Sequence, residues 1–258
     1  MKKNQIFNIL IFLIGGVLFI LIVLPILTIL SNLLSTNIFS FFKDSELINS
    51  ISMTIYASLI ATIFGIFGGI PLGYILANYD FPLKKTVEAF IDIPVVIPHT
   101  AAGIALLTVF GRNAVLGKLF SFLGVKFVNE VPGIILAMIY VSVPFLINHV
   151  KEGFKKVDRE LEAVSRTLGA SKFTTFMKVS LPLVKGDIIS GSIMMWARGI
   201  SEFGAIVILA YNPKVISTLI YDRFESFGLR SSAPSVAFLL LLIITVFVVL
   251  RIITDRKK

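Results

Sequence analysis

The segment ELEAVSRTLGA, residues 160–170, is charged and helix-patterned, and it lies between two long apolar runs. Apolar positions in and just before this segment recur at the spacing of an amphipathic helix: Val157, Leu161, Val164 and Leu168. Asp158 is expected to cap the helix, because its short side chain can accept hydrogen bonds from the first free amides. Gly169 is expected to end it, since glycine takes the left-handed backbone that follows many helices.

A second short helix is predicted directly after the first. Its apolar residues are Phe173, Phe176 and Met177; Ser171 stands ahead of them and Pro182 closes the stretch. Two amphipathic helices on the polar surface of a membrane protein indicate docking to another protein. The alternative is an interfacial helix that lies among lipid headgroups.

The chain as a whole has the composition of a polytopic membrane protein. It has 258 residues, 56% of them hydrophobic, and a mean hydropathy of +0.93. Several runs could each cross about 30 Å of hydrocarbon. They predict an all-α integral membrane protein with six transmembrane helices, centred on residues 7–34, 51–78, 93–111, 131–150, 187–211 and 232–252. The third run contains Pro94, Pro98 and His99. The first is too long for the apolar region of a signal peptide, so we interpret it as a retained helix.

The distribution of Lys and Arg predicts the orientation. Of the 24 such residues, sixteen fall on the side of the N-terminus and seven on the other, while Arg198 lies inside a span. Because cytoplasmic segments carry the excess, both termini and the 151–186 loop are placed in the cytoplasm of a multi-pass plasma-membrane protein. This bias accounts for most of the net charge of +9, and no nucleic-acid site is indicated.

Some chemistry is excluded by residue content. Cysteine is missing from the sequence, which excludes disulfides and thiolate metal sites, and His99 and His149 have no metal-ligand spacing. No G-x-x-x-x-G-K-[ST] phosphate loop occurs, since Gly117-Lys118 is followed by Leu119. We therefore expect this chain to hold no cofactor, and ATP-driven work would need a partner chain with a nucleotide site.

The second run carries small residues on one helix face: Gly65, Gly69 and Gly73. Between helices in lipid, where hydrophobic attraction is lost, small residues let two backbones approach closely. We expect this face to pack against another helix.

Two opposite charges fall within the fifth apolar run, Arg198 and Glu202, four residues apart and therefore on one face of the predicted helix. An unpaired charge at that depth costs about 3 kcal/mol on insertion scales. The two side chains must therefore pair with each other, face a wet cavity or contact another helix, and these alternatives stay open. His99 could donate to an anion or to a freed backbone carbonyl. With Ser201, these residues are the candidate lining of a translocation path.

The segment that begins at Asp158 resembles the EAA loop of ABC-transporter permeases. That pattern is E-A-A, three residues, G, nine residues and I-x-L-P. We match it to Glu162-Ala163-Val164, to Gly169 and to Val179-Ser180-Leu181-Pro182. In that family the loop forms a coupling helix that sits in a groove of a separate ATPase subunit. The resemblance implies coupling roles for Asp158, Arg159, Glu162, Ala163, Arg166, Gly169, Leu181 and Pro182.

Two further segments resemble the oxyanion permeases of ABC importers. WARGISEFGA at residues 196–205 is similar to the fifth span of the sulfate and molybdate/tungstate members. DIPVVIPHTAAG at residues 92–103 is similar to the D-x-P-x-V-x-P-H-T-x-A-G segment of molybdate/tungstate permeases. The resemblance extends from about residue 45 to residue 250. A sulfate or thiosulfate permease is the nearest alternative.

The resemblance implies a complete architecture and a set of partners. The fold would be that of a type I ABC importer permease, with an N-terminal helix and outer loop at 1–45, a five-helix core at 46–253 containing the 151–186 coupling loop, and a cytoplasmic tail at 254–258. Two copies would pair as a homodimer in the lipid. Two ATP-binding subunits would hold ATP and Mg²⁺, and an extracytoplasmic binding protein would deliver tungstate or molybdate. The chain itself would be no enzyme. An intramembrane enzyme would need a nucleophile or metal beside its base, and a passive channel would need no docking helix.

Overall fold

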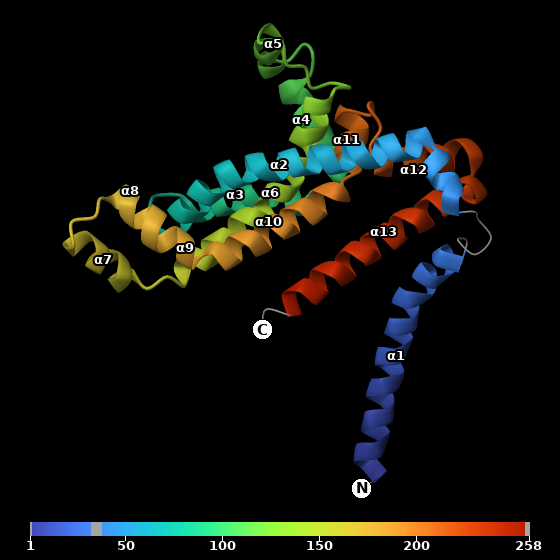
Figure 1. Cartoon of the computed structure of the whole chain (residues 1–258), viewed down its shortest axis with the longest axis horizontal. Coiled ribbons are helices and arrows are strands. Elements are labelled where there is room, and N and C mark those ends of the chain that lie inside the picture. Colours follow the sequence, from blue (N-terminus) through green and yellow to red (C-terminus); the bar gives the residue numbers. More distant parts are fainter. Residues whose placement is uncertain (1, 32–37, 256–258) are drawn as a thin grey trace. The chain divides into compact units, whose positions relative to one another are not determined.

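The computed structural model describes residues 2–31 and 38–255, and these residues form helices and connecting loops without any strand (Figure 1). The α-helices in chain order are α1 (Lys2–Ser31), α2 (Ser45–Asn78), α3 (Lys84–Val96), α4 (His99–Phe110), α5 (Val115–Phe122), α6 (Val131–Lys155), α7 (Arg159–Thr167), α8 (Lys172–Thr175), α9 (Leu181–Leu183), α10 (Lys185–Ile200), α11 (Gly204–Leu209), α12 (Ile216–Phe227) and α13 (Leu229–Asp255). A 3₁₀ helix, η2 (Ile38–Lys43), precedes α2, and a π-helical turn, η3 (Phe176–Ser180), joins α8 to α9. The expectation of an all-helical chain is confirmed.

The chain divides into two compact units. Residues Ser50–Thr218 form one, here called the core unit, and Met1–Asn49 with Leu219–Lys258 form the other, here called the terminal unit. Both regions that the sequence singles out for function lie in the core unit.

Three helices in the described part of the chain are long and apolar enough to cross a membrane: Phe7–Ser31 within α1, α2 and α6. The α3–α4 pair adds a fourth if it is counted as one span, although the two helices are bent by 116°. The six predicted spans are therefore matched only in part by helix length. Residues 32–34 of the first predicted run and 256–258 of the predicted tail lie outside the described residues.

Two of the predicted spans are interrupted. The third begins earlier than predicted, at Lys84, and its helix breaks at Ile97, whose ψ of 149° is extended. Pro98 explains this break, because a proline disfavours the helical conformation of the residue before it. The fifth ends as α10 at Ile200 and resumes as the short α11 at Gly204. Glu202 thus lies beyond the helix of Arg198, which corrects the expectation of one continuous helix face.

The core unit is built on α6, which packs against α3, α4, α10 and α11. The predicted packing face of α2 is confirmed, because its glycines lie against α6 and α10. A Cβ on Gly73 would come within 2.7 Å of Val150 Cγ1, and one on Gly65 would overlap Met195. Close approach without side chains is how helices associate where burial from water supplies no drive.

In the terminal unit, α1 contacts α13, and a ring stack joins Phe41 to Phe238 with 5.0 Å between centroids. Arg223 in α12 pairs with Asp44 at 2.8 Å and with Glu46 at 3.3 Å. Its guanidinium donates to Asp44, and this hydrogen bond holds the pKa of that carboxyl below its usual value. The pair ties α12 to the chain just before α2.

Candidate coupling surface and buried charge cluster

Helix α7 has the predicted ends. The Asp158 carboxylate accepts a hydrogen bond from the Glu160 amide at 2.9 Å, which satisfies one of the free amides at the helix start. Gly169 has a φ of +89°, the left-handed conformation that glycine adopts without strain. Both expectations about the helix ends are confirmed.

The apolar face of α7 is left uncovered by the part of the chain that the structure describes. Leu161 is 48% exposed, Val164 56% and Leu168 83%, and no residue of α7 is buried. Phe173 and Met177 in the following segment are also exposed. Ala163, Arg159 and Arg166 are exposed beside these apolar side chains. We call the five apolar residues Leu161, Val164, Leu168, Phe173 and Met177 the coupling surface.

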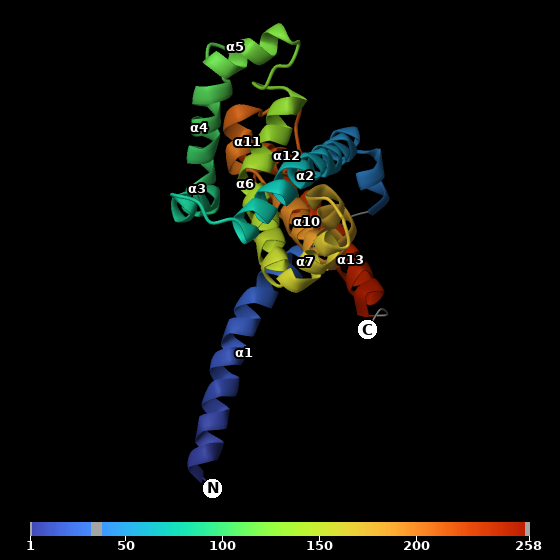
Figure 2. The same cartoon turned by 90° about the vertical axis from the view of Figure 1, so that its left-hand side faces the viewer.

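Figure 1 places α7 and α8 at one end of the core unit, and α4, α5 and α11 at the other. Figure 2 views the chain from the α7 end, with α7 in front. The coupling surface therefore lies at the opposite end of the core unit from the α4–α11 contact.

A hydrogen bond between side chains joins the two halves of the segment. The hydroxyl of the fully buried Ser180 donates to the Glu162 carboxylate. Ser165 and Thr175 add a second bond at 3.1 Å. Arg166 donates to the backbone oxygen of Glu162 at 3.3 Å. Glu162 holds α7 onto η3.

The match of Glu162 to the EAA pattern is off by one residue. Four residues, 165–168, separate Val164 from Gly169, where the pattern has three. Counted back from Gly169, Ala163 stands at the place of the pattern's glutamate. The reason to select Glu162 is therefore its hydrogen bond to Ser180, because its position does not match that of the glutamate in the EAA pattern. Ser180 is not among the site residues predicted from the sequence. Its position directly before Leu181 and Pro182, which were predicted, could have indicated it.

The second part of the segment is longer than predicted. Pro182 does not close a helix but lies in the first turn of α9, after which the chain continues into α10. A proline is tolerated there because the first turn of a helix has amides without intrahelical partners. Ser171 caps α8 by accepting from the Thr174 amide at 3.1 Å, as expected.

An aromatic cluster fixes this segment to the helices of the core unit. Phe176 lies 4.9 Å from Tyr74 in α2 and 6.0 Å from Phe154 in α6, measured between ring centroids. Leu181 packs against the same group of buried residues, which includes Val184. A force applied to the coupling surface therefore reaches α2, α6 and α10 through packed side chains.

The second region is a cluster of three charged or polar side chains, from α4, from α10 and from the turn that follows α10. Glu202 Oε2 lies 3.0 Å from Arg198 Nη2 and 2.7 Å from His99 Nδ1. Glu202 is only 1% exposed, whereas the side chains of Arg198 and His99 are 24% and 31% exposed. The other carboxylate oxygen, Oε1, accepts from the Ala205 amide at 2.9 Å. The buried charge is thus fully paired, as its cost in an apolar interior requires.

His99 contacts both partners of this ion pair. Its Nδ1 lies 2.7 Å from Glu202 Oε2, and a carboxylate only accepts, so Nδ1 donates in this contact. Arg198 Nη2 lies 2.6 Å from the same Nδ1 and 2.8 Å from Nε2, so the guanidinium contacts both ring nitrogens. The three side chains therefore form one connected cluster.

Small residues allow the elements of the cluster to meet. A Cβ on Gly204 would lie 2.6 Å from His99 Cβ, and one on Gly103 would lie 2.9 Å from the Ala205 oxygen. Helix α4 therefore runs directly beside α11 (Figure 2). Ser201, the fourth predicted path residue, is exposed and accepts from Arg198 Nη1 at 3.2 Å. All four predicted path residues come together.

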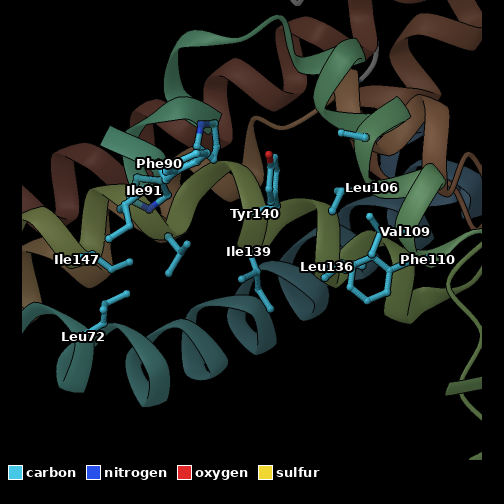
Figure 3. Close-up of a pocket in the computed structure, with 14 residues that line it drawn as sticks. Leu72, Phe90, Ile91, Leu106, Val109, Phe110, Leu136, Ile139, Tyr140 and Ile147 are labelled. Carbon is cyan, nitrogen blue, oxygen red and sulfur yellow. The ribbon is translucent and has the colours of Figure 1, made fainter. Parts of the chain in front are cut away.

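A separate cavity of about 510 Å³ lies between α2, α3, α4 and α6. Figure 3 shows its lining, which includes Phe90, Leu106, Phe110, Tyr140 and Ile147. None of the lining residues is charged, and none belongs to the cluster. An apolar lining does not suit a divalent anion, so this cavity is not a candidate anion site.

Comparison with known proteins identifies relatives along most of the chain. The family described as "Binding-protein-dependent transport system inner membrane component" matches residues 69–257. A molybdate/tungstate transport system permease protein of Methanocaldococcus jannaschii is 44% identical over 235 residues, 91% of each chain. Its counterpart in Pyrococcus abyssi is 42% identical and covers 95% of this chain and 94% of its own length. A probable sulfate transport system permease protein of Marchantia polymorpha is 30% identical over 83% of this chain and 76% of its own.

Solved structures share the fold at low sequence identity. The bacterial ABC transporter that imports alginate matches 96% of this chain and 94% of its own, with a TM-score of 0.74 and 19% identity. The methionine ABC transporter, in an inward-facing conformation, matches 81% and 93%, with a TM-score of 0.61 and 18% identity.

Proposed function

The chain belongs to the family of binding-protein-dependent transport system inner membrane components, and from this we propose that it forms the translocation path of an ATP-driven importer for molybdate or tungstate. As a member of this family it is a transport subunit and not an enzyme. The observation that supports molybdate or tungstate as the substrate is the 44% identity, over 91% of both chains, to a permease named for molybdate and tungstate. The relatives named for sulfate are 28–32% identical.

We infer that the coupling surface docks on a separate ATPase subunit, which binds ATP and Mg²⁺. The support is physical: an amphipathic helix with capped ends presents an uncovered apolar stripe, and large exposed apolar patches mark interaction sites. Beside this surface, Ala163, Arg159 and Arg166 would also contact the ATPase. The other proposed coupling residues act from within the segment by capping, bending or anchoring it: Asp158, Glu162, Gly169, Leu181 and Pro182.

The arrangement in the membrane is proposed to be that of a type I importer. Six spans would cross the bilayer with both termini in the cytoplasm, and two copies would pair and engage two ATPase subunits. A binding protein outside the cytoplasm would deliver the oxyanion. The division into an N-terminal helix and outer loop (1–45), a core (46–253) and a tail (254–258) belongs to this proposal.

We propose that Arg198, His99, Glu202 and Ser201 belong to the path. The partial exposure of Arg198 and His99 supports this, since it leaves both side chains accessible to an anion from outside the chain. The competing interpretation, an internal pair with no transport role, is supported by the complete pairing of Glu202. Only measurement of transport separates the two.

The alternatives are less well supported. A sulfate or thiosulfate permease would use the same fold and the same anion chemistry, so it differs only in the binding protein and the fit of the path. An intramembrane enzyme would need a nucleophile or metal beside the cluster. The described residues contain no group of three or more metal-ligating side chains. A passive channel would leave the coupling surface without a purpose.

The test is ATPase activity of this chain assembled with its ATPase in lipid nanodiscs. Binding protein is added empty or loaded with tungstate, molybdate or sulfate. We expect the tungstate- or molybdate-loaded protein to stimulate hydrolysis and the sulfate-loaded or empty protein to leave it at the basal rate. Stimulation by sulfate would transfer the assignment to the sulfate permeases. No stable complex with an ATPase would contradict the coupling role.

A further inference from the structure

Resting on the function proposed above, we propose that Glu202 is a positioning residue, an internal anion that holds Arg198 until the transported oxyanion displaces it. In this role Glu202 never contacts the substrate. Arg198 is the residue that binds, and Glu202 and His99 determine when its guanidinium is available.

The first support is the difference in burial within the cluster. Glu202 is 1% exposed and takes hydrogen bonds from Arg198, His99 and the Ala205 amide, so it is enclosed by protein donors. Arg198 is 24% exposed, and its second nitrogen points at the hydroxyl of exposed Ser201. An anion that arrives from solvent therefore meets Arg198 and Ser201, while Glu202 lies behind them.

The second support is chemical equivalence. A guanidinium binds carboxylates and tetrahedral oxyanions through the same pair of parallel N–H groups. A divalent oxyanion and the Glu202 carboxylate are thus alternative ligands for Arg198. With Glu202 in place, the charge of Arg198 is already paired within the cluster, and an anion gains little by staying. This competition prevents the oxyanion from binding so tightly in the passage that its release becomes slow.

The third support is the contact between His99 and Glu202. When Arg198 turns towards an oxyanion, the His99 Nδ1–H and the Ala205 amide still donate to Glu202. The buried carboxylate then keeps two donors, which lowers the cost of losing its ion pair. His99 belongs to α4, whereas Arg198 belongs to α10. Displacement of Glu202 would therefore also release α10 from the side chain that joins it to α4.

The experiment measures retention of radiolabelled tungstate by the nanodisc-reconstituted transporter complex, without binding protein. Glu202→Gln leaves the amide in the carboxylate's place but removes the competing charge. We expect tungstate to bind this variant more tightly than wild type by about tenfold, the scale of one charge-assisted hydrogen bond. Glu88→Gln is the matched control, because Glu88 pairs with Lys151 between α3 and α6 and lies outside the cluster.

A double variant makes the test specific and keeps it decisive if the Glu202→Gln single variant misfolds. Arg198→Gln with Glu202→Gln removes both charges, and we expect it to lose the gained affinity and to import tungstate poorly while remaining assembled. The inference is overturned if Glu202→Gln binds no more tightly than Glu88→Gln. It is also overturned if the double variant keeps the gained affinity or imports at the wild-type rate. If Glu202→Gln does not assemble, uptake by the double variant decides.

Failure of the inference is distinguishable from failure of the proposed function. A wild-type complex that ignores tungstate- and molybdate-loaded binding protein removes the function, and the inference with it. A wild-type complex that responds, combined with an unchanged Glu202→Gln variant, removes the inference alone.

Discussion

The coupling surface and the buried charge cluster satisfy opposite physical demands within one core unit. The coupling surface is apolar and exposed. The polar side chains beside it form local hydrogen bonds that cap α7 and hold it on η3. The cluster is charged and enclosed, and its bonds join residues about a hundred positions apart. A surface made for a partner leaves apolar area uncovered, whereas a buried charge has to be paired within the chain.

Because of this difference, we expect loss of function to have a different cause in each region. Changes at the coupling surface should leave the chain folded and cut its response to the ATPase. Changes in the cluster should combine a cost in folding with a cost in transport. The following predictions test that division, from the largest effect to the smallest.

In the coupling region, we expect the largest effect on uptake from Gly169→Pro. Proline fixes φ near −65°, and Gly169 requires +89°, so the chain after α7 would leave in another direction. We expect uptake into proteoliposomes to fall by about a hundredfold or more, because α8 and η3 would no longer support α7. The matched control is Gly169→Asn, since asparagine tolerates the left-handed conformation. Equal uptake by the proline variant and wild type would remove the coupling role of this bend.

In the cluster, we expect Arg198→Ala to lower uptake more than it lowers the amount of folded protein. Removing Arg198 leaves the Glu202 carboxylate buried without its ion pair, a change that typically costs about 3–5 kcal/mol. Some loss of yield is therefore expected in either case. Uptake is divided by the amount of folded protein measured by fluorescence-detected size exclusion. If the two fall in proportion, the cluster serves folding alone.

These two regions differ in how far the sequence could predict them. Asp158 and Gly169 act on neighbouring residues, so their roles followed from local pattern. The break at residues 201–203 was missed, because hydropathy averaged over the run from 187 to 211 does not register a helix end. The contact of His99 with Glu202 was also out of reach, since it depends on how α4 meets α11 through Gly103 and Gly204. Both residues were still found individually, because ionisable groups inside apolar runs are rare.

Glu162→Lys should uncouple more weakly than Gly169→Pro. It replaces the acceptor of the Ser180 hydroxyl with a donor, so α7 loses its bond to η3 while both helix ends persist. We expect about a tenfold loss of uptake, the order of one buried hydrogen bond to a charged group, with basal ATP hydrolysis kept. Glu160→Lys is the matched control, because Glu160 is exposed on the same helix. Equal effects of the two substitutions would show that charge at this surface matters and the Ser180 bond does not.

The smallest effect is expected outside both regions, at Asp44. Its hydrogen bond with Arg223 lowers the folded-state pKa below the unfolded value, so the pair stabilises the chain above that unfolded value. This contribution is lost as the pH falls from about 4 through the folded pKa, where the carboxylate takes up a proton. Asp44→Asn should therefore lower the Tm at pH 7 and make no difference at the acid end of the range. Partly exposed pairs contribute about 1 kcal/mol or less. A thermal melt series from pH 7 downwards measures both forms. A constant difference in Tm across the series would mean that the Asp44 side chain stabilises this unit through packing and not through its charge.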